Sequence, residues 1–126
     1  MARGTNGIGW FEISTSDVPA AERFYGGLFG WTFAADEGSA DYRLVTTPVE
    51  EGLRGGIVDN GGTGPRYAIF YVVVDDVEET CRRAESAGGK VVVAPRAMPG
   101  GLVLAHLHDP AGNLFAVYRP PAAAAA

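Results

Sequence analysis

The strongest constraint on the fold of this 126-residue chain is an internal repeat with an offset of 59 residues. Identical residues stand at matching points of the two halves: Phe11 and Phe70, Asp17 and Asp76, Val18 and Val77, and Gly30 and Gly89. Each half therefore reads as a strand, an acidic helix cap, a helix, a glycine stop and further strands. Such self-similarity predicts one supersecondary unit that is used twice.

The first half begins with the alternating stretch "GWFEIS", which predicts a strand. Asp17 is the expected N-cap of the helix that follows, with Pro19 in its first turn and Gly30 as its C-terminal stop. A stripe of apolar residues at helical spacing is expected to pack this helix onto its sheet: Val18, Ala21, Tyr25 and Leu28.

The second half begins with "YAIFYVVV", a stretch of β-branched and aromatic residues that is typical of a strand. Asp76 caps the next helix, and Glu79 three residues later completes a pattern that resembles a capping box. The single cysteine, Cys81, excludes an internal disulfide. We interpret Cys81 as a small buried helix residue, with a nucleophilic role as the alternative.

Three short strands are expected after each helix: "WTFAA", "DYRLVTT" and "GLRGGIV", then "KVVVA", "GLVLAHLH" and "NLFAVY". Each half is thus βαβββ, and the fold class is α+β with a mixed sheet covered by helices on one face. The modules span 7–58 and 66–119, with a glycine-rich linker at 59–65. They form one domain over 1–121, and the alanine tail at 122–126 is expected to be disordered.

Charge and hydropathy exclude several classes of partner. The net charge is −5 and no run of Lys and Arg appears, so we expect neither a nucleic-acid nor a membrane partner. The longest apolar run is too short to span a bilayer, and "MARGTNG" is no hydrophobic signal segment. We therefore expect a cytoplasmic protein.

Two motifs carry a resemblance to a known family. "DVPAAERFYGGLFGW" and "HDPAGNLFAVY" resemble segments of the vicinal oxygen chelate superfamily, also called the glyoxalase/bleomycin resistance/dioxygenase superfamily. The resemblance extends from about Gly7 to Arg119. It implies two βαβββ modules whose sheets curl into a cleft, usually in a homodimer.

Family enzymes such as glyoxalase I hold a divalent metal with His and Glu side chains on the first and last strands of each module. The resemblance places these positions on residues that cannot coordinate a metal: Trp10, Ile69, Ala116, and either Gly56 or Ile57. We therefore predict no metal site at the usual place and no cofactor.

Strand alternation, combined with the family resemblance, predicts which side chains line the cleft. The expected lining is apolar and aromatic with a few polar groups: Trp10, Glu12, Ser14, Tyr67, Ile69, Tyr71, Leu102, Leu104, His106, Leu114, Ala116 and Tyr118. Such a lining suits a flat, largely apolar ligand that a few hydrogen bonds orient.

Several of these residues have alternative interpretations. Trp10 stacks on a ligand or fills the core, and Glu12 lies in the cleft or on a solvated strand. Glu12 and His106 are the candidates for acid–base work. His106 and His108 share a strand face, so they could instead bind a metal with a third ligand such as Glu12 or Asp109.

The sequence therefore supports one main hypothesis and two rivals. The main one is a metal-free, dimeric protein that sequesters a hydrophobic aromatic small molecule, as the bleomycin-resistance branch of the family does. The first rival is a cofactor-free enzyme that uses Glu12 and His106 as an acid–base pair. The second is a metal-dependent lyase, isomerase or dioxygenase with relocated ligands. Fold alone does not decide among them.

Overall fold

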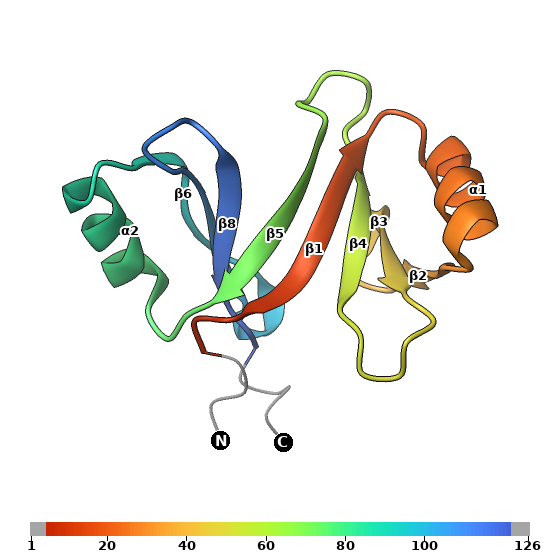
Figure 1. The fold of residues 1–126 in the computed structure, drawn as a ribbon, viewed down its shortest axis with the longest axis horizontal. Coiled ribbons are helices and arrows are strands. Elements are labelled where there is room, and N and C mark those ends of the chain that lie inside the picture. The colour runs from red at the N-terminus through yellow and green to blue at the C-terminus, as the bar shows by residue number, and fades with distance from the viewer. Residues whose placement is uncertain (1–4, 122–126) are drawn as a thin grey trace. The chain divides into compact units, whose positions relative to one another are not determined.

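The computed structural model describes residues 5–121, so the predicted alanine tail at 122–126 lies outside the described part. Within it the order of elements is β1-α1-β2-β3-β4 followed by β5-α2-β6-β7-β8, with a short 3₁₀ helix, Pro99–Gly101, between β6 and β7 (Figure 1). The predicted α+β fold with two βαβββ modules is confirmed. No helix in residues 5–121 is long and apolar enough to cross a membrane.

The chain divides into two compact units, which we describe separately. One is Trp10–Ile69, and the other combines the described residues before and after it, 5–9 and 70–121. The boundaries cut through two strands, because the start of β1 belongs to the second unit and the start of β5 to the first. Backbone hydrogen bonds from Asn6 N to Val73 O and from Val73 N to Gly7 O hold the N-terminal segment within the second unit.

The unit Trp10–Ile69 holds four strands in the order β2-β3-β4-β1. Their bounds are Ile8–Thr15 for β1, Thr32–Asp36 for β2, Ser39–Thr46 for β3 and Arg54–Asp59 for β4. β1 runs parallel to β4, whereas the other two pairs are antiparallel. The helix α1, Val18–Phe29, lies against one face of these strands (Figure 1).

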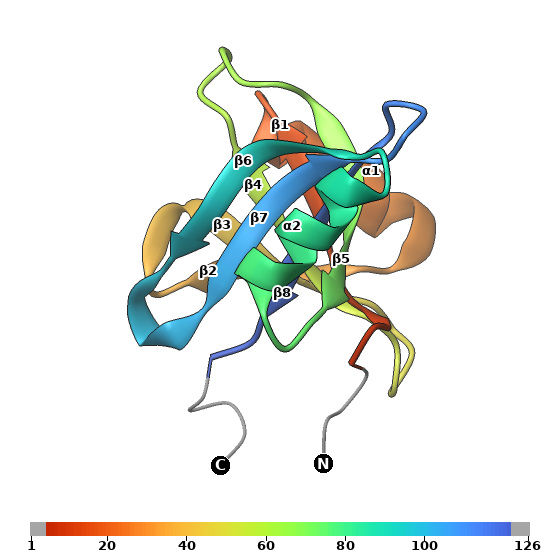
Figure 2. The same ribbon diagram turned by 90° about the vertical axis from the view of Figure 1, so that its left-hand side faces the viewer.

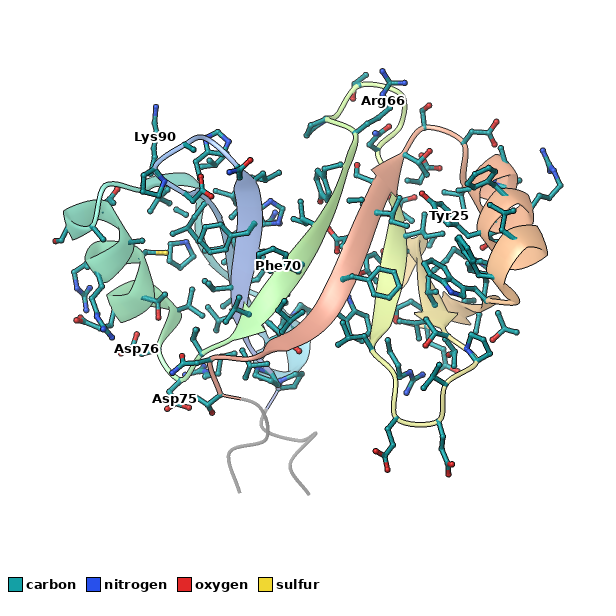
Figure 3. All side chains as sticks on the ribbon, in the orientation of Figure 1. Tyr25, Arg66, Phe70, Asp75, Asp76 and Lys90 are labelled. Atoms are coloured by element: carbon teal, nitrogen blue, oxygen red, sulfur yellow. The ribbon has the colours of Figure 1, made fainter. Side chains whose placement is uncertain are left out.

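The core of this unit lies between α1 and the sheet. Ile13, Val45 and Ile57 form the buried cluster, and Tyr25 from α1 packs against it (Figure 3). The Tyr25 ring stacks on Trp31, with 5.2 Å between the centroids and 9° between the planes. As predicted, Asp17 caps the helix by accepting from Ala20 N at 3.1 Å.

The predicted packing of α1 is wrong for one residue of its apolar stripe. Leu28 is 59% exposed and does not pack on the sheet. Gly30 ends the helix in the left-handed region at φ 73°, and the chain then returns with Trp31, whose ring covers the core beside Tyr25. The place expected for Leu28 is therefore taken by an aromatic residue that follows the helix.

The second unit holds strands in the order β5-β8-β7-β6. Their bounds are Tyr67–Val73 for β5, Lys90–Ala97 for β6, Val103–His108 for β7 and Leu114–Arg119 for β8. β5 and β8 are parallel, and the other pairs are antiparallel. The helix α2, Val77–Ser86, lies across one face of this sheet (Figure 2).

The core of this unit joins α2 to that face, with Val77 and Cys81 from the helix and Ala105, Leu107 and Val117 from β7 and β8. Cys81 is 6% exposed, which confirms a small buried helix residue. Burial raises the pKa of its thiol, with a smaller contribution from Glu85, so the thiolate nucleophile is disfavoured.

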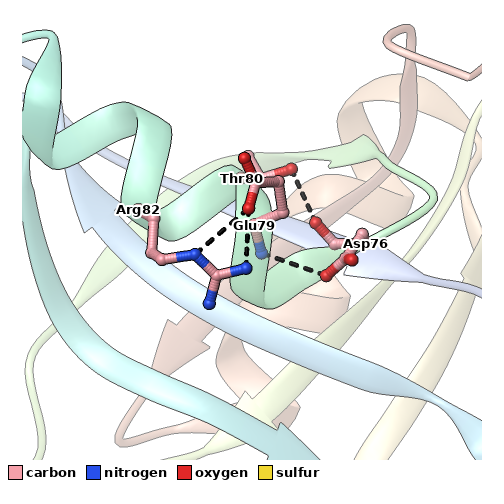
Figure 4. Close-up of polar contacts among 4 residues, drawn as sticks. All are labelled: Asp76, Glu79, Thr80 and Arg82. Atoms are coloured by element: carbon pink, nitrogen blue, oxygen red, sulfur yellow. Dashed lines mark hydrogen bonds and ion pairs between the residues drawn. The ribbon is translucent and has the colours of Figure 1, made fainter.

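Asp76 begins α2 as predicted, since its carboxylate accepts from Glu79 N at 3.0 Å (Figure 4). The predicted capping box is incomplete, because the Glu79 carboxylate binds the Arg82 guanidinium at 2.6 Å instead of returning to the cap. An oppositely charged partner three residues along the helix surface competes for that carboxylate.

The cap makes a prediction about stability. Asp76→Ala removes an acceptor for a helix N–H, so we expect the free energy of unfolding to fall by about 1 kcal/mol. Asp75→Ala is the matched control, because Asp75 is an exposed neighbour of the same charge (Figure 3). Urea unfolding followed by circular dichroism measures both. Equal loss in the two variants would contradict the assigned cap.

Candidate functional site

A hydrogen-bonded chain of four side chains lies on the face of the first unit's sheet that α1 does not cover. The Trp10 indole N–H donates to the Tyr42 hydroxyl at 2.9 Å, and this hydroxyl donates to Glu12 Oε1 at 2.8 Å. The Tyr67 hydroxyl donates to Glu12 Oε2 at 2.5 Å. We call these four residues the Glu12 cluster.

Strand alternation explains why the Glu12 cluster gathers on this face. Ile13 belongs to the core beneath α1 and Phe11 packs against it, so Trp10 and Glu12 point the opposite way. Glu12 is 9% exposed, whereas Trp10 is half-buried. This placement agrees with the face predicted for both residues.

A glycine makes room for the tyrosine that binds Glu12. Gly56 is the β4 neighbour of Glu12, and a Cβ there would collide with the ring of Tyr42 from β3. Glycine within a strand is typical of such a close approach. Tyr42 therefore fills the space beside Glu12 that a side chain at position 56 would need.

The carboxylate and its low-polarity surroundings change the acidity of both tyrosines. Burial raises the pKa of Tyr42 well above its ordinary value of 10.0, and the nearby negative charge of Glu12 raises it further. Burial and the hydrogen bond to Glu12 raise the pKa of Tyr67 in the same way. Both hydroxyls are therefore held as donors to Glu12 across the physiological pH range.

Ser14, which is also predicted to line the site, contacts the linker. Its hydroxyl donates to Pro65 O at 2.7 Å and accepts from Asn60 Nδ2 at 3.3 Å, which ties β1 to the linker. Ser14 is 5% exposed. Ile69 lies in the same unit and is also buried.

The second unit carries its own aromatic cluster on the sheet face opposite α2. The Tyr71 hydroxyl lies 3.2 Å from His106 Nε2, and the rings of Tyr71 and Tyr118 meet edge to face with centroids 5.7 Å apart. The backbone register places His106 beside Ala116, and Ala116 beside Tyr71. Burial raises the pKa of Tyr118.

The apolar residues predicted to line the site differ in how much of their surface is exposed. Leu104 and Leu114 are half-buried on the strands β7 and β8, whereas Ala116 has no exposed surface. The prediction that Leu102 belongs to the strand is wrong. Leu102 follows the turn at Pro99–Gly101, and β7 begins only at Val103, because the Met98 N–H to Leu102 O hydrogen bond closes that turn.

The metal that the fold family implies does not fit the residues at its positions. Trp10, Gly56, Ile69 and Ala116 supply no ligand atom. Within residues 5–121, no three or more His, Cys, Asp and Glu side chains gather in an arrangement that could hold a metal ion. His106 and His108 therefore lack a third ligand among the described residues, and we derive no step through a metal.

The C-terminal motif "HDPAGN" forms a turn. The Asp109 carboxylate accepts from the backbone N–H groups of Ala111 and Asn113, each at 2.9 Å, and from the Asn113 side chain. These hydrogen bonds lower the pKa of Asp109, and Gly112 adopts φ 93°. Asp109 thus shapes the link between β7 and β8.

The sequence profile of the Glyoxalase/Bleomycin resistance protein/Dioxygenase superfamily matches residues 7–117. The chain belongs to this superfamily. Its solved structural neighbours include methylmalonyl-CoA epimerase from Mycobacterium tuberculosis, with a TM-score of 0.65 and 20% identity over 100% of this chain and 97% of the other. At this identity the likeness shows the fold alone.

Two curated proteins are similar to this chain in sequence. The Streptomyces peucetius anthracycline biosynthesis protein DnrV is 35% identical over an alignment of 127 positions, which covers 87% of this chain and 46% of DnrV. A glyoxylase-like domain-containing protein of Didymella fabae is 29% identical, with 90% of this chain and 94% of the relative covered. The chain thus spans about half the length of DnrV.

Sequence reasoning missed Tyr42 as a member of the cluster. The available signal was the pair Gly55 and Gly56 inside a strand, because consecutive strand glycines indicate that a neighbouring side chain approaches the backbone. Tyr42 also stands three residues before the buried Val45, so alternation places it on the opposite face.

The Tyr42 hydroxyl makes a testable contribution to stability. Tyr42→Phe leaves the indole N–H of Trp10 and one oxygen of buried Glu12 without this partner, so we expect a loss of about 1–3 kcal/mol in the free energy of unfolding. Tyr25→Phe keeps the stacked ring and is the control, with little expected loss. Equal urea midpoints for Tyr42→Phe and the wild type would contradict the assigned role.

The raised pKa values of Tyr42 and Tyr67 predict a loss of stability in alkali. Both groups hold their protons more tightly when folded, so the stability they contribute is complete below their unfolded pKa near 10.0 and is lost as the pH rises above it. Glu12→Gln removes the negative charge, so tyrosinate absorbance should develop at lower pH in this variant. An unchanged titration curve would argue against coupling to Glu12.

Proposed function

We propose that this chain binds a flat aromatic small molecule at the Glu12 cluster and holds it without a metal. The observation that carries the proposal is a buried carboxylate that accepts hydrogen bonds from neutral hydroxyls. Glu12 accepts from Tyr42 and Tyr67, and no salt bridge of the described residues includes it. A buried charge of this kind needs donors, and a ligand can supply another.

The carboxylate and the rings suggest the chemistry of the ligand. Two carboxylate oxygens offer about four acceptor positions, of which the tyrosines use two. An additional O–H or N–H donor on the ligand would therefore find an acceptor at Glu12. The half-buried rings of Trp10 and Tyr67 offer apolar faces for an aromatic system. Together they favour a planar aromatic ligand with a hydroxyl or amine group.

The name of one relative, DnrV, supports the same class of ligand. DnrV is named for anthracycline biosynthesis, and anthracyclines are planar polycyclic compounds with phenolic hydroxyls. Because this chain spans about half of DnrV, the likeness suggests a ligand class and not a reaction. Sequestration of such a compound, as in self-protection against an antibiotic, is the function that we propose.

A cofactor-free enzyme remains the second candidate, because a buried carboxylate on a strand can act as a general base. Tyr42 and Tyr67 donate to Glu12 at 2.8 and 2.5 Å, so the enzyme would have to use an acceptor position of Glu12 that these hydroxyls leave open. Turnover of the ligand by metal-free protein, lost in Glu12→Gln while binding persists, would favour the enzyme.

Fluorescence titration with an anthracycline tests the proposal. The two tryptophans are internal reporters, since Trp10 belongs to the Glu12 cluster and Trp31 packs against the core beneath α1. We expect quenching in the wild type, its loss in Trp10→Phe, and affinity at least tenfold weaker in Glu12→Gln, or about 1.4 kcal/mol. Quenching that survives Trp10→Phe would contradict a ligand at this cluster.

The same titration addresses the prediction that His106 orients the ligand. His106→Gln and His108→Gln are a matched pair, because both histidines stand on β7 and His106 contacts Tyr71. Weaker binding confined to His106→Gln would support the prediction. Equal affinities in both variants would contradict a role of His106 in ligand binding.

A further inference from the structure

We propose, on the basis of the function proposed above, that the ligand presents a positively charged amine to Glu12. The Glu12 cluster would then recognise an aromatic ammonium compound in preference to one that carries only neutral hydroxyls. The charge at the site is the starting point. Glu12 is buried, and the hydroxyls of Tyr42 and Tyr67 that donate to its carboxylate carry no charge.

The arginines of the same unit do not neutralise this carboxylate. Arg43 follows Tyr42 on β3, but strand alternation turns it to the opposite face, where its Nε binds Glu22 of α1 at 2.6 Å. The unit holds three other arginines, all of them exposed: Arg23, Arg54 and Arg66. Among residues 5–121, no ion pair includes Glu12. The tyrosines solvate the negative charge without balancing it, so a ligand cation would supply what the unit lacks.

The repeat shows that the fold does not require a charge at this point of the sheet. The counterpart of Glu12 at the offset of 59 residues is Tyr71, and each stands on the first strand of its module. The register agrees, since Glu12 lies beside Gly56 of β4 and Tyr71 lies beside Ala116 of β8.

One module is therefore built with a tyrosine hydroxyl where the other places a carboxylate. Burying a carboxylate is the more costly of the two, because a charge loses more hydration than a hydroxyl does. A costly group that the architecture does not need indicates a functional role for that group. For Glu12, that role would be to attract a positive charge.

Aromatic rings border the carboxylate. Trp10 on β1, Tyr42 on β3 and Tyr67 on β5 supply the polar atoms of the Glu12 cluster, so their rings lie close to Glu12. Trp10 and Tyr67 are half-buried, which leaves part of their surface for a ligand. The faces of Trp and Tyr rings attract cations. An ammonium group would thus be stabilised by the rings and by the carboxylate, whereas a neutral hydroxyl would form a hydrogen bond alone.

Calorimetric titration with two naphthalene probes tests the charge of the ligand. Naphthylmethylamine is an ammonium ion at pH 7, and naphthalenemethanol presents a neutral hydroxyl from the same ring position. We expect wild-type protein to bind the amine about tenfold or more tightly than the alcohol, because a charge-assisted hydrogen bond is roughly twice as strong as a neutral one. Equal dissociation constants would overturn the proposed charge and leave the aromatic site in place. Failure of both probes to bind would contradict the proposed function as well.

Two matched variants separate the site from the net charge of the protein. Glu12→Gln and Glu22→Gln each remove one negative charge, but Glu22 lies on α1 and binds Arg43. We expect Glu12→Gln to bind both probes about equally and Glu22→Gln to keep the preference for the amine. Binding of the alcohol by Glu12→Gln shows that this variant is folded, and the wild-type comparison decides the question even if it is not. A preference that survives in Glu12→Gln, or that is lost in Glu22→Gln, would overturn the assignment to Glu12.

Discussion

Burial of the Glu12 carboxylate is the constraint on which the candidate site depends. Removing a charge from water is costly unless hydrogen-bond donors replace the solvent. Tyr42 and Tyr67 provide those donors, and Trp10 orients Tyr42 from the other side. Gly56 is part of the same arrangement, because any side chain there would displace Tyr42. The cluster is thus specified jointly by β1, β3, β4 and β5.

The repeated βαβββ unit supports two different surfaces. In each unit the helix buries one sheet face, which leaves aromatic and polar residues on the opposite face. The helices themselves differ, since α2 presents charge to water and α1 presents Phe24 and Leu28. A shared architecture with divergent surfaces is consistent with a superfamily in which function depends on particular residues and not on the fold.

Local patterns predicted the elements well because they depend on short-range rules. Alternation placed Glu12 on the helix-free face, and Asp17 and Asp76 cap the helices as expected. These rules did not predict the exposure of Leu28 or the role of Tyr42. The exposure of Leu28 depends on how the chain places Trp31 after the helix, and the role of Tyr42 depends on the close approach of its ring to Gly56 of β4. Three-dimensional packing decides the exposure of Leu28 and the position of Tyr42. No local sequence pattern predicts the identity of the ligand.

The most direct test of metal-free binding at the Glu12 cluster is calorimetric titration of an anthracycline into chelator-treated protein, with and without added zinc. We propose that Glu12, Trp10 and the tyrosines bind the ligand, and none of these residues needs a metal at the family's positions. We therefore expect one ligand per chain and the same dissociation constant in both conditions. Binding that appears only after zinc is added, or no binding in either condition, would contradict metal-free binding at the Glu12 cluster.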